Sequence, residues 1–169
     1  SNIINALYYA ADNGAKIVNI SLSSLVDVPF IGQAIDYGLS LNVLYVCATG
    51  NNNSNIINYP AGYASTKENV IAVGSTNLND VRSNPFFWNS ASGSNYGSYL
   101  TVVAPGNYIW SIQNSCDNCY NVYWGGTSQA TPLVTGIASL VKSMNSDLTP
   151  SQIKNIIKNS SQDLVGLST

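Results

Sequence analysis

Two short apolar segments on either side of a stretch with helical spacing restrict the possible folds more than any other feature of this 169-residue chain. Residues 16 to 22 and 43 to 48 are rich in β-branched and apolar side chains, as buried strands are. Between them, residues 28 to 40 carry apolar side chains at helical intervals, from Ile31 to Leu39. Strand, helix and strand with short connections indicate parallel pairing, and nearly continuous apolar strands indicate a sheet covered on both faces. The predicted fold class is α/β, with three α/β/α layers and a mostly parallel sheet.

The segments before and after this unit extend the same pattern. Residues 2 to 11 place apolar side chains on one helical face, and Asn13-Gly14 ends that helix. Apolar runs at 70 to 73 and 100 to 104 predict further strands, and residues 107 to 124 predict a hairpin. The alternation therefore continues along most of the chain.

Two helices are predicted to close the chain, at residues 127 to 144 and 150 to 159. The second has a clear start, because Thr149 stands three residues before Gln152 and Pro150 takes the first helical position. No repeat or linker divides the sequence, and its length suits one core. Residues 1 to 169 are therefore interpreted as part or all of a single domain.

The composition argues against two classes of partner. Charged residues make up 8% of the chain, the net charge is −2, and the six basic residues are scattered singly. Such a chain lacks the basic patch of a nucleic-acid-binding protein and the basic amphipathic stripe of a membrane-surface helix. We expect neither nucleic acid nor membrane as a partner, and any targeting signal is expected to lie outside this chain.

Three cysteines bear on metal binding and on cellular location. Cys47 lies in an apolar run, whereas Cys116 and Cys119 share one loop. Zinc would need further ligands, and the chain has no histidine, so a zinc site is disfavoured. A local disulfide between Cys116 and Cys119 fits better and would suit an oxidising compartment, which favours a secreted protein. A buried thiol that only packs is the simplest interpretation of Cys47.

Ser128 follows Gly125, Gly126 and Thr127 and opens the predicted helix at 127 to 144. The first N–H groups of a helix have no partner within it, and the helix dipole favours negative charge at this end. Ser128 can thus combine a nucleophilic hydroxyl with a nearby donor for an anion. Serine and threonine at such a position also serve very often only as helix caps, so this segment alone does not distinguish a nucleophile from a cap.

Several segments together resemble the subtilisin family of serine proteases, and they occur in that family's order and at similar intervals across nearly the whole chain. These are Ala48-Thr49-Gly50-Asn51, Tyr59-Pro60-Ala61, Ala104-Pro105-Gly106, and Gly126-Thr127-Ser128 with Ala130, Pro132 and Gly136. The resemblance implies a subtilisin-like fold and a serine endopeptidase acting on proteins or peptides by acyl-enzyme chemistry. Residues 1 to 169 would then be the C-terminal portion of one catalytic domain, incomplete at both ends.

The resemblance also implies residue roles. Ser128 is expected to be the nucleophile, and its backbone N–H and the Asn51 side chain are expected to form the oxyanion hole. Five further residues are expected at the substrate: Ala48, Thr49, Gly50, Asn58 and Thr127. The first three would line a pocket wall, and Asn58 stands at the expected pocket floor, where the family often has glycine.

The chain contains no histidine to take the proton of Ser128. Subtilisin-like enzymes place their aspartate and histidine before the serine, so both are expected upstream of Ser1, in the remaining N-terminal part of the catalytic domain. Lys142 is no substitute, because fourteen helical residues separate it from Ser128 by roughly 21 Å.

Two alternatives remain open. One is a catalytically inactive pseudoprotease or peptide-binding module. The other is a sedolisin-type peptidase, which uses a glutamate base but carries aspartate where this chain has Asn51. The family resemblance allows calcium, yet the few separated acidic residues form no recognisable ligand loop, so no metal ligand and no cofactor is assigned.

Overall fold

The computed structural model describes residues 2–113, 117–118 and 120–164. Its centre is a four-stranded sheet in the order β1-β2-β3-β4, with every neighbouring pair parallel. The strands are β1 (Ile17–Ile20), β2 (Leu44–Ala48), β3 (Val70–Thr76) and β4 (Val102–Pro105). The parallel pairing predicted from the sequence is confirmed.

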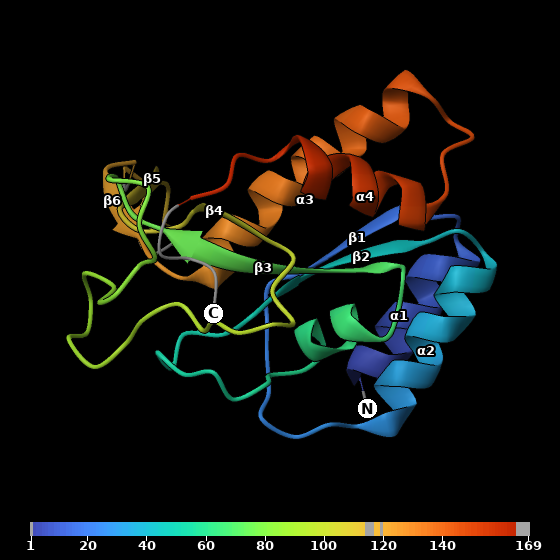
Figure 1. Cartoon of the computed structure of the whole chain (residues 1–169), viewed down its shortest axis with the longest axis horizontal. Helices are drawn as coiled ribbons and strands as arrows, with labels where there is room; N and C mark the ends of the chain where they lie inside the picture. Colours follow the sequence, from blue (N-terminus) through green and yellow to red (C-terminus); the bar gives the residue numbers. More distant parts are fainter. Residues whose placement is uncertain (1, 114–116, 119, 165–169) are drawn as a thin grey trace.

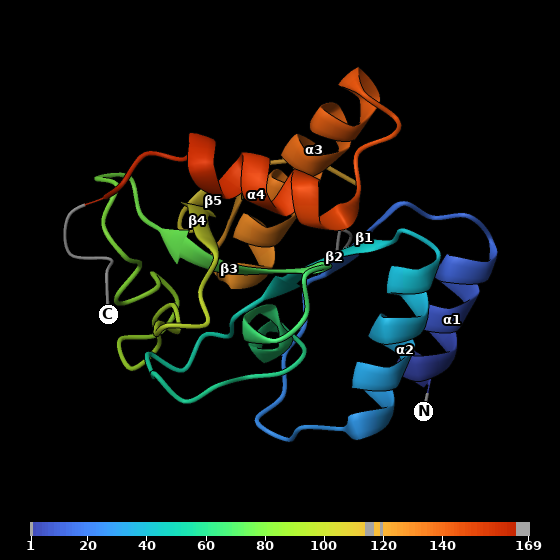
Figure 2. The same ribbon diagram turned by 45° about the vertical axis from the view of Figure 1, so that its right-hand side comes forward.

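Helices cover both faces of this sheet, as Figures 1 and 2 show. On one face lie α1 (Asn2–Asp12), α2 (Pro29–Ser40) and the short 3-10 helix η1 (Ala61–Ser65). On the other lie α3 (Thr127–Met144) and α4 (Pro150–Ser160). The three predicted layers are therefore confirmed.

Side chains of β2 and β3 alternate between two cores, one on each face of the sheet. Tyr45 and Cys47 pack toward the α1–α2 face, whereas Leu44 and Val46 pack toward α3 and α4. All four are fully buried. Because both faces are apolar, these strands show no polar alternation in the sequence, which is why they were recognisable as central strands.

A separate two-stranded sheet pairs β5 (Ile109–Ser111) with β6 (Val122–Trp124) in antiparallel fashion, so the predicted hairpin is confirmed. Cys116 and Cys119 lie outside the described residues, and their disulfide and the secretion it favours stay predictions. Cys47 is free and buried, and burial raises the pKa of its thiol. None of the described helices is long and apolar enough to cross a membrane.

Several boundaries differ from the predictions. The first strand stops at Ile20 rather than at residue 22; the next backbone carbonyl, that of Ser21, accepts the Ser128 hydroxyl of α3 instead of a strand N–H. The strand predicted at 70 to 73 extends to Thr76, and η1 was not predicted. The start of α4 was right in detail: Thr149 and Gln152 form a capping box, and Pro150 opens the helix.

Candidate active site

The carboxyl end of β2 and the first turn of α3 meet at one edge of the sheet, although they are about 76 residues apart in the chain. Asn51 Oδ1 accepts hydrogen bonds from the backbone N–H of Thr127 at 2.9 Å and from its hydroxyl at 3.0 Å. The Gly50 N–H donates to Thr127 Oγ1 at 3.1 Å. The structure thus brings together the two segments that the sequence singled out, at the strand ends where α/β sheets place ligands.

Glycine is required at two positions of this junction. Gly126 has φ +152°, and a Cβ there would lie 3.0 Å from Asn51 Nδ2 and 2.9 Å from Gln129 Oε1. Gly50 has φ +101°, and a Cβ there would lie 2.4 Å from Asn58 Nδ2. Only glycine adopts such dihedral angles without strain and allows so close an approach.

The N–H groups of the first turn of α3 are not all used. Thr127 N donates to Asn51, and Gln129 N and Ala130 N approach Gly126 O at 3.1 and 3.4 Å. Within the described part of the chain, neither the N–H of Ser128 nor Asn51 Nδ2 has a hydrogen-bond acceptor. Two donors at the start of the helix that carries Ser128 are therefore free, at the helix end that favours an anion.

Ser128 itself is half-buried and bonded to Ser21, the residue that follows β1. Its Oγ donates to Ser21 O at 3.0 Å, and Ser21 Oγ donates to Ser128 O at 2.9 Å. The hydroxyl is thus not paired with a titratable side chain of the described residues. Lys142 Nζ donates instead to Leu148 O at 2.7 Å, near the far end of α3, so it is no base for Ser128.

Ala48 and Thr49 are placed at the end of β2 with their side chains buried. The Thr49 hydroxyl donates to Val73 O at 3.1 Å, inside the sheet. Any contact of these two residues with a substrate would have to come from their backbone. Their predicted role in a pocket wall stays a prediction.

Asn58 is 2% exposed and packs beneath Gly50. Its Nδ2 approaches Ser23 Oγ at 3.3 Å and Asn52 Oδ1 at 3.4 Å. Its Oδ1 is buried and has no hydrogen-bond partner among the described residues. Asn58 therefore fills the space next to Gly50 with a polar group, and its role as a pocket floor stays a prediction.

Asn95 is a residue of this site that sequence reasoning missed. Its Nδ2 donates to Thr49 O at 3.0 Å, and its Oδ1 accepts from Asn52 N at 2.9 Å and Ser54 N at 3.3 Å. It thus fixes the loop that carries Asn51. No local pattern marks it, because its partners lie more than 40 residues earlier.

Exposed aromatic side chains next to the glycines before Ser128 were also missed. Trp88 Nε1 donates to Gly125 O at 2.8 Å, and a Cβ at Gly125 would lie 3.0 Å from the Phe87 ring. Phe87 stacks on Tyr108 with ring centroids 4.9 Å apart. The segment leading to Ser128 therefore contacts the side chains of Phe87 and Trp88, and Tyr108, just before β5, packs on Phe87.

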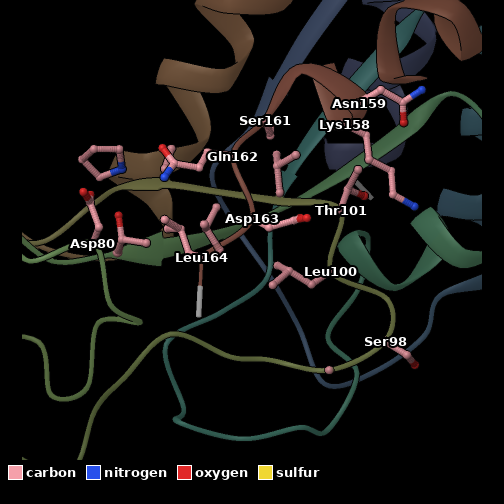
Figure 3. Close-up of a pocket in the computed structure, with 16 residues that line it drawn as sticks. Asp80, Ser98, Leu100, Thr101, Lys158, Asn159, Ser161, Gln162, Asp163 and Leu164 are labelled. Carbon is pink, nitrogen blue, oxygen red and sulfur yellow. The ribbon is translucent and has the colours of Figure 1, made fainter. Parts of the chain in front are cut away.

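A groove of about 1110 Å³ lies elsewhere, along the edge strand β4. Figure 3 shows its lining, which includes Leu100 and Thr101 before β4 and Lys158 and Asn159 at the end of α4. It contains none of the predicted site residues. In the part of the chain that the structure describes, no three His, Cys, Asp or Glu side chains gather as a metal site would require.

The sequence profile of the Subtilase family matches residues 1–169. This chain belongs to the subtilase family. The M-protease of Shouchella clausii (strain KSM-K16) is 38% identical to this subtilase over 164 residues, which cover 97% of the chain. Thermitase from Thermoactinomyces vulgaris is 36% identical over 167 residues, or 99% of the chain.

Solved structures agree with the family assignment. A cold-adapted subtilisin-like serine proteinase superposes with a TM-score of 0.78 at 28% identity, covering 98% of the chain. The fold of this subtilase is therefore subtilisin-like. The chain spans 39% of the M-protease, 54% of thermitase and 56% of the cold-adapted proteinase. It thus corresponds to between about two fifths and just over half of such a protein.

Proposed function

We propose that this subtilase chain contributes the nucleophile and the oxyanion donors of a serine endopeptidase. The observation that carries the proposal is the pair of free donors, the Ser128 N–H and Asn51 Nδ2, at the start of the helix that carries the Ser128 hydroxyl. A peptide carbonyl attacked by Ser128 Oγ develops negative charge on its oxygen, and fixed donors stabilise that charge without reorganising. The substrate would be a protein or peptide, in keeping with the named proteases that the chain resembles.

The reaction needs a base that this chain does not supply. Ser128 Oγ would attack the carbonyl carbon while a histidine outside this chain takes its proton and passes it to the leaving amine. Water would then attack the acyl-serine while the histidine takes its proton and returns it to Ser128 Oγ, which releases the acid product. We propose that this histidine and its aspartate belong to the sequence preceding Ser1.

Two features support a missing N-terminal portion as the partner. β1 is an edge strand of the described sheet, so one side of its backbone is open to further pairing. α3 also presents an exposed apolar stripe at three- and four-residue spacing: Leu133 (45% exposed), Ile137 (50%), Leu140 (68%) and Met144 (88%). Exposed apolar patches of this kind mark surfaces that another chain segment covers.

One observation favours a second candidate, a peptide-binding pseudoprotease. The Ser128 hydroxyl donates to a backbone carbonyl, Ser21 O, rather than to a base. A protein without histidine and aspartate in the remaining sequence would keep the pocket and lose the chemistry.

Treatment of the natural full-length protein with a fluorophosphonate, followed by intact-mass analysis, separates the two candidates. The endopeptidase should gain one phosphonyl group, and the Ser128→Ala variant should gain none. A folded full-length protein that stays unmodified would exclude the endopeptidase and leave the peptide-binding module.

A further inference from the structure

Pro132 lies within α3, four residues after Ser128. In an α-helix the carbonyl oxygen of residue i accepts from the N–H of residue i+4, and proline has no N–H. The Ser128 carbonyl therefore lacks its helical donor. The missing bond falls on the residue whose hydroxyl the proposed reaction uses.

Ser21 supplies the donor that Pro132 lacks. Its Oγ lies 2.9 Å from Ser128 O, while its own carbonyl accepts the Ser128 hydroxyl at 3.0 Å. One residue after β1 thus holds both the backbone and the side chain of Ser128. Both groups are partly buried, where a lost hydrogen bond is not fully replaced by water.

Ser21 is itself held by α3 through one further residue. Asn19 Nδ2 donates to Ser21 Oγ at 2.8 Å, which leaves the Ser21 hydroxyl proton for Ser128 O. Thr135 Oγ1, two turns into α3, lies 2.9 Å from Asn19 Oδ1 and 3.0 Å from Thr131 O, so these two acceptors share its one proton. The chain of hydrogen bonds Thr135, Asn19, Ser21, Ser128 therefore closes between β1 and α3.

We propose that Ser21 is a positioning residue for the nucleophile, a role that rests on the proposed function. Its hydroxyl replaces the N–H missing at Pro132 and fixes the first turn of α3, so that Ser128 Oγ and the Ser128 N–H keep their mutual geometry. Ser21 acts through Ser128 and exchanges no proton with the substrate. Removal of the Ser21 hydroxyl should slow acylation of Ser128 and leave peptide binding unchanged.

The test is a double-mutant cycle in the full-length protein: wild type, Ser21→Ala, Pro132→Ala and the double variant. The rate of phosphonylation by a fluorophosphonate and the kcat and KM for a peptide substrate are measured. Ser21→Ala should lower the phosphonylation rate and kcat roughly tenfold, with KM within about twofold, in line with one lost hydrogen bond.

The Pro132→Ala exchange restores an N–H that can donate to Ser128 O. In the Pro132→Ala background, Ser21→Ala should lower the phosphonylation rate and kcat less than about threefold, because the Ser128 carbonyl keeps a donor. Ser21→Thr, which retains the hydroxyl, should restore most of the rate. A purely structural role for Ser21, such as filling space, would give the same loss in both backgrounds and would overturn the proposal.

The outcomes separate this role from the proposed function. A wild-type protein that is not phosphonylated would overturn the proposed function and this role with it. A phosphonylated wild type whose rate Ser21→Ala leaves unchanged would overturn this role alone. If Ser21→Ala fails to fold, Thr135→Val is used instead, because it removes the hydroxyl at the other end of this series of hydrogen bonds. Phosphonylation should then be about two- to threefold slower. An unchanged rate overturns the proposal.

Discussion

The two helices on the same face of the sheet begin in opposite ways. α4 starts with a capping box, in which Thr149 accepts from Gln152 N at 3.3 Å and Gln152 Oε1 accepts from Thr149 N at 2.8 Å. α3 starts at Gly126, which provides no side-chain cap. Its first N–H is satisfied by Asn51, from another part of the chain, and the next one is left free.

This difference separates a helix start built from local contacts from one assembled by distant residues. The α4 start is capped by Thr149 and Gln152, three residues apart, and Pro150 has no N–H to satisfy, so this start depends on no distant segment. The α3 start depends on Asn51, Gly50 and Ser21, and retains the Ser128 N–H beside a hydroxyl. Substitutions at the two starts should therefore affect different measurements.

The largest effect is expected at Asn51. Asn51→Ala should lower the kcat of the full-length protein about 100- to 1,000-fold, the loss known for one oxyanion donor of a subtilisin. Asn51→Asp is the matched variant, because it keeps an acceptor for Thr127 N but removes the Nδ2 donor. A kcat of Asn51→Asp near that of wild type would mean that Asn51 only caps α3, and the comparison would fail.

Gly126 should show the next effect. An alanine at φ +152° is strained and brings a Cβ close to Asn51 Nδ2, so Gly126→Ala should lower the free energy of unfolding by about 1–3 kcal/mol and slow phosphonylation. Gly136→Ala in the same helix is the control. Its Cβ would meet nothing within 4 Å, so it should raise stability by about 0.5–1 kcal/mol. Denaturant unfolding measures both changes in free energy. If the two variants change stability in the same direction, Gly126 is not the strained position described above.

A smaller effect is expected at the α4 start. Thr149→Ala removes a side-chain cap and should lower the free energy of unfolding by about 1 kcal/mol. Thr149→Ser keeps the cap and should stay near wild type. Neither variant should change the rate of phosphonylation, and a changed rate would show that the two helix starts are coupled.

The smallest effect at neutral pH is expected on the opposite face of the sheet, at Tyr45. Its hydroxyl is buried without a hydrogen-bond partner among the described residues, and burial together with Cys47 raises the pKa of Tyr45 from 10.0 to about 12. Between these values the unfolded chain loses the proton before the folded chain does, so stability falls as the pH rises.

Tyr45→Phe removes this contribution. Its unfolding free energy at pH 7 should lie within about 1 kcal/mol of wild type, because no satisfied hydrogen bond is lost. Its fall in stability between pH 10 and pH 12 should be smaller than that of wild type or of Tyr9→Phe, on the exposed side of α1. If stability falls equally with pH in Tyr45→Phe and in wild type, the assignment to Tyr45 is refuted. The variants at the two helix starts should show the wild-type fall in stability over this pH range.

Much of the framework could be predicted from the sequence because its signals are local. Nearly continuous apolar runs predicted the central strands, and the helical spacing between the first two predicted their parallel pairing. The spacing of Thr149, Pro150 and Gln152 predicted the start of α4. The segment around Ser128 and the segment ending at Asn51 were recognised from their motifs. Each of these signals lies within a few residues of chain.

The tertiary structure alone decided how those segments meet. Asn51 Oδ1 accepts from Thr127 N, and Asn95 fixes the loop that carries Asn51. The Ser21 hydroxyl donates to Ser128 O in place of the N–H that Pro132 lacks. These contacts join residues more than 40 positions apart, with no periodicity to mark them. Sequence pattern determines which backbone groups an element leaves unpaired, and only the packing of distant elements determines which side chain satisfies them.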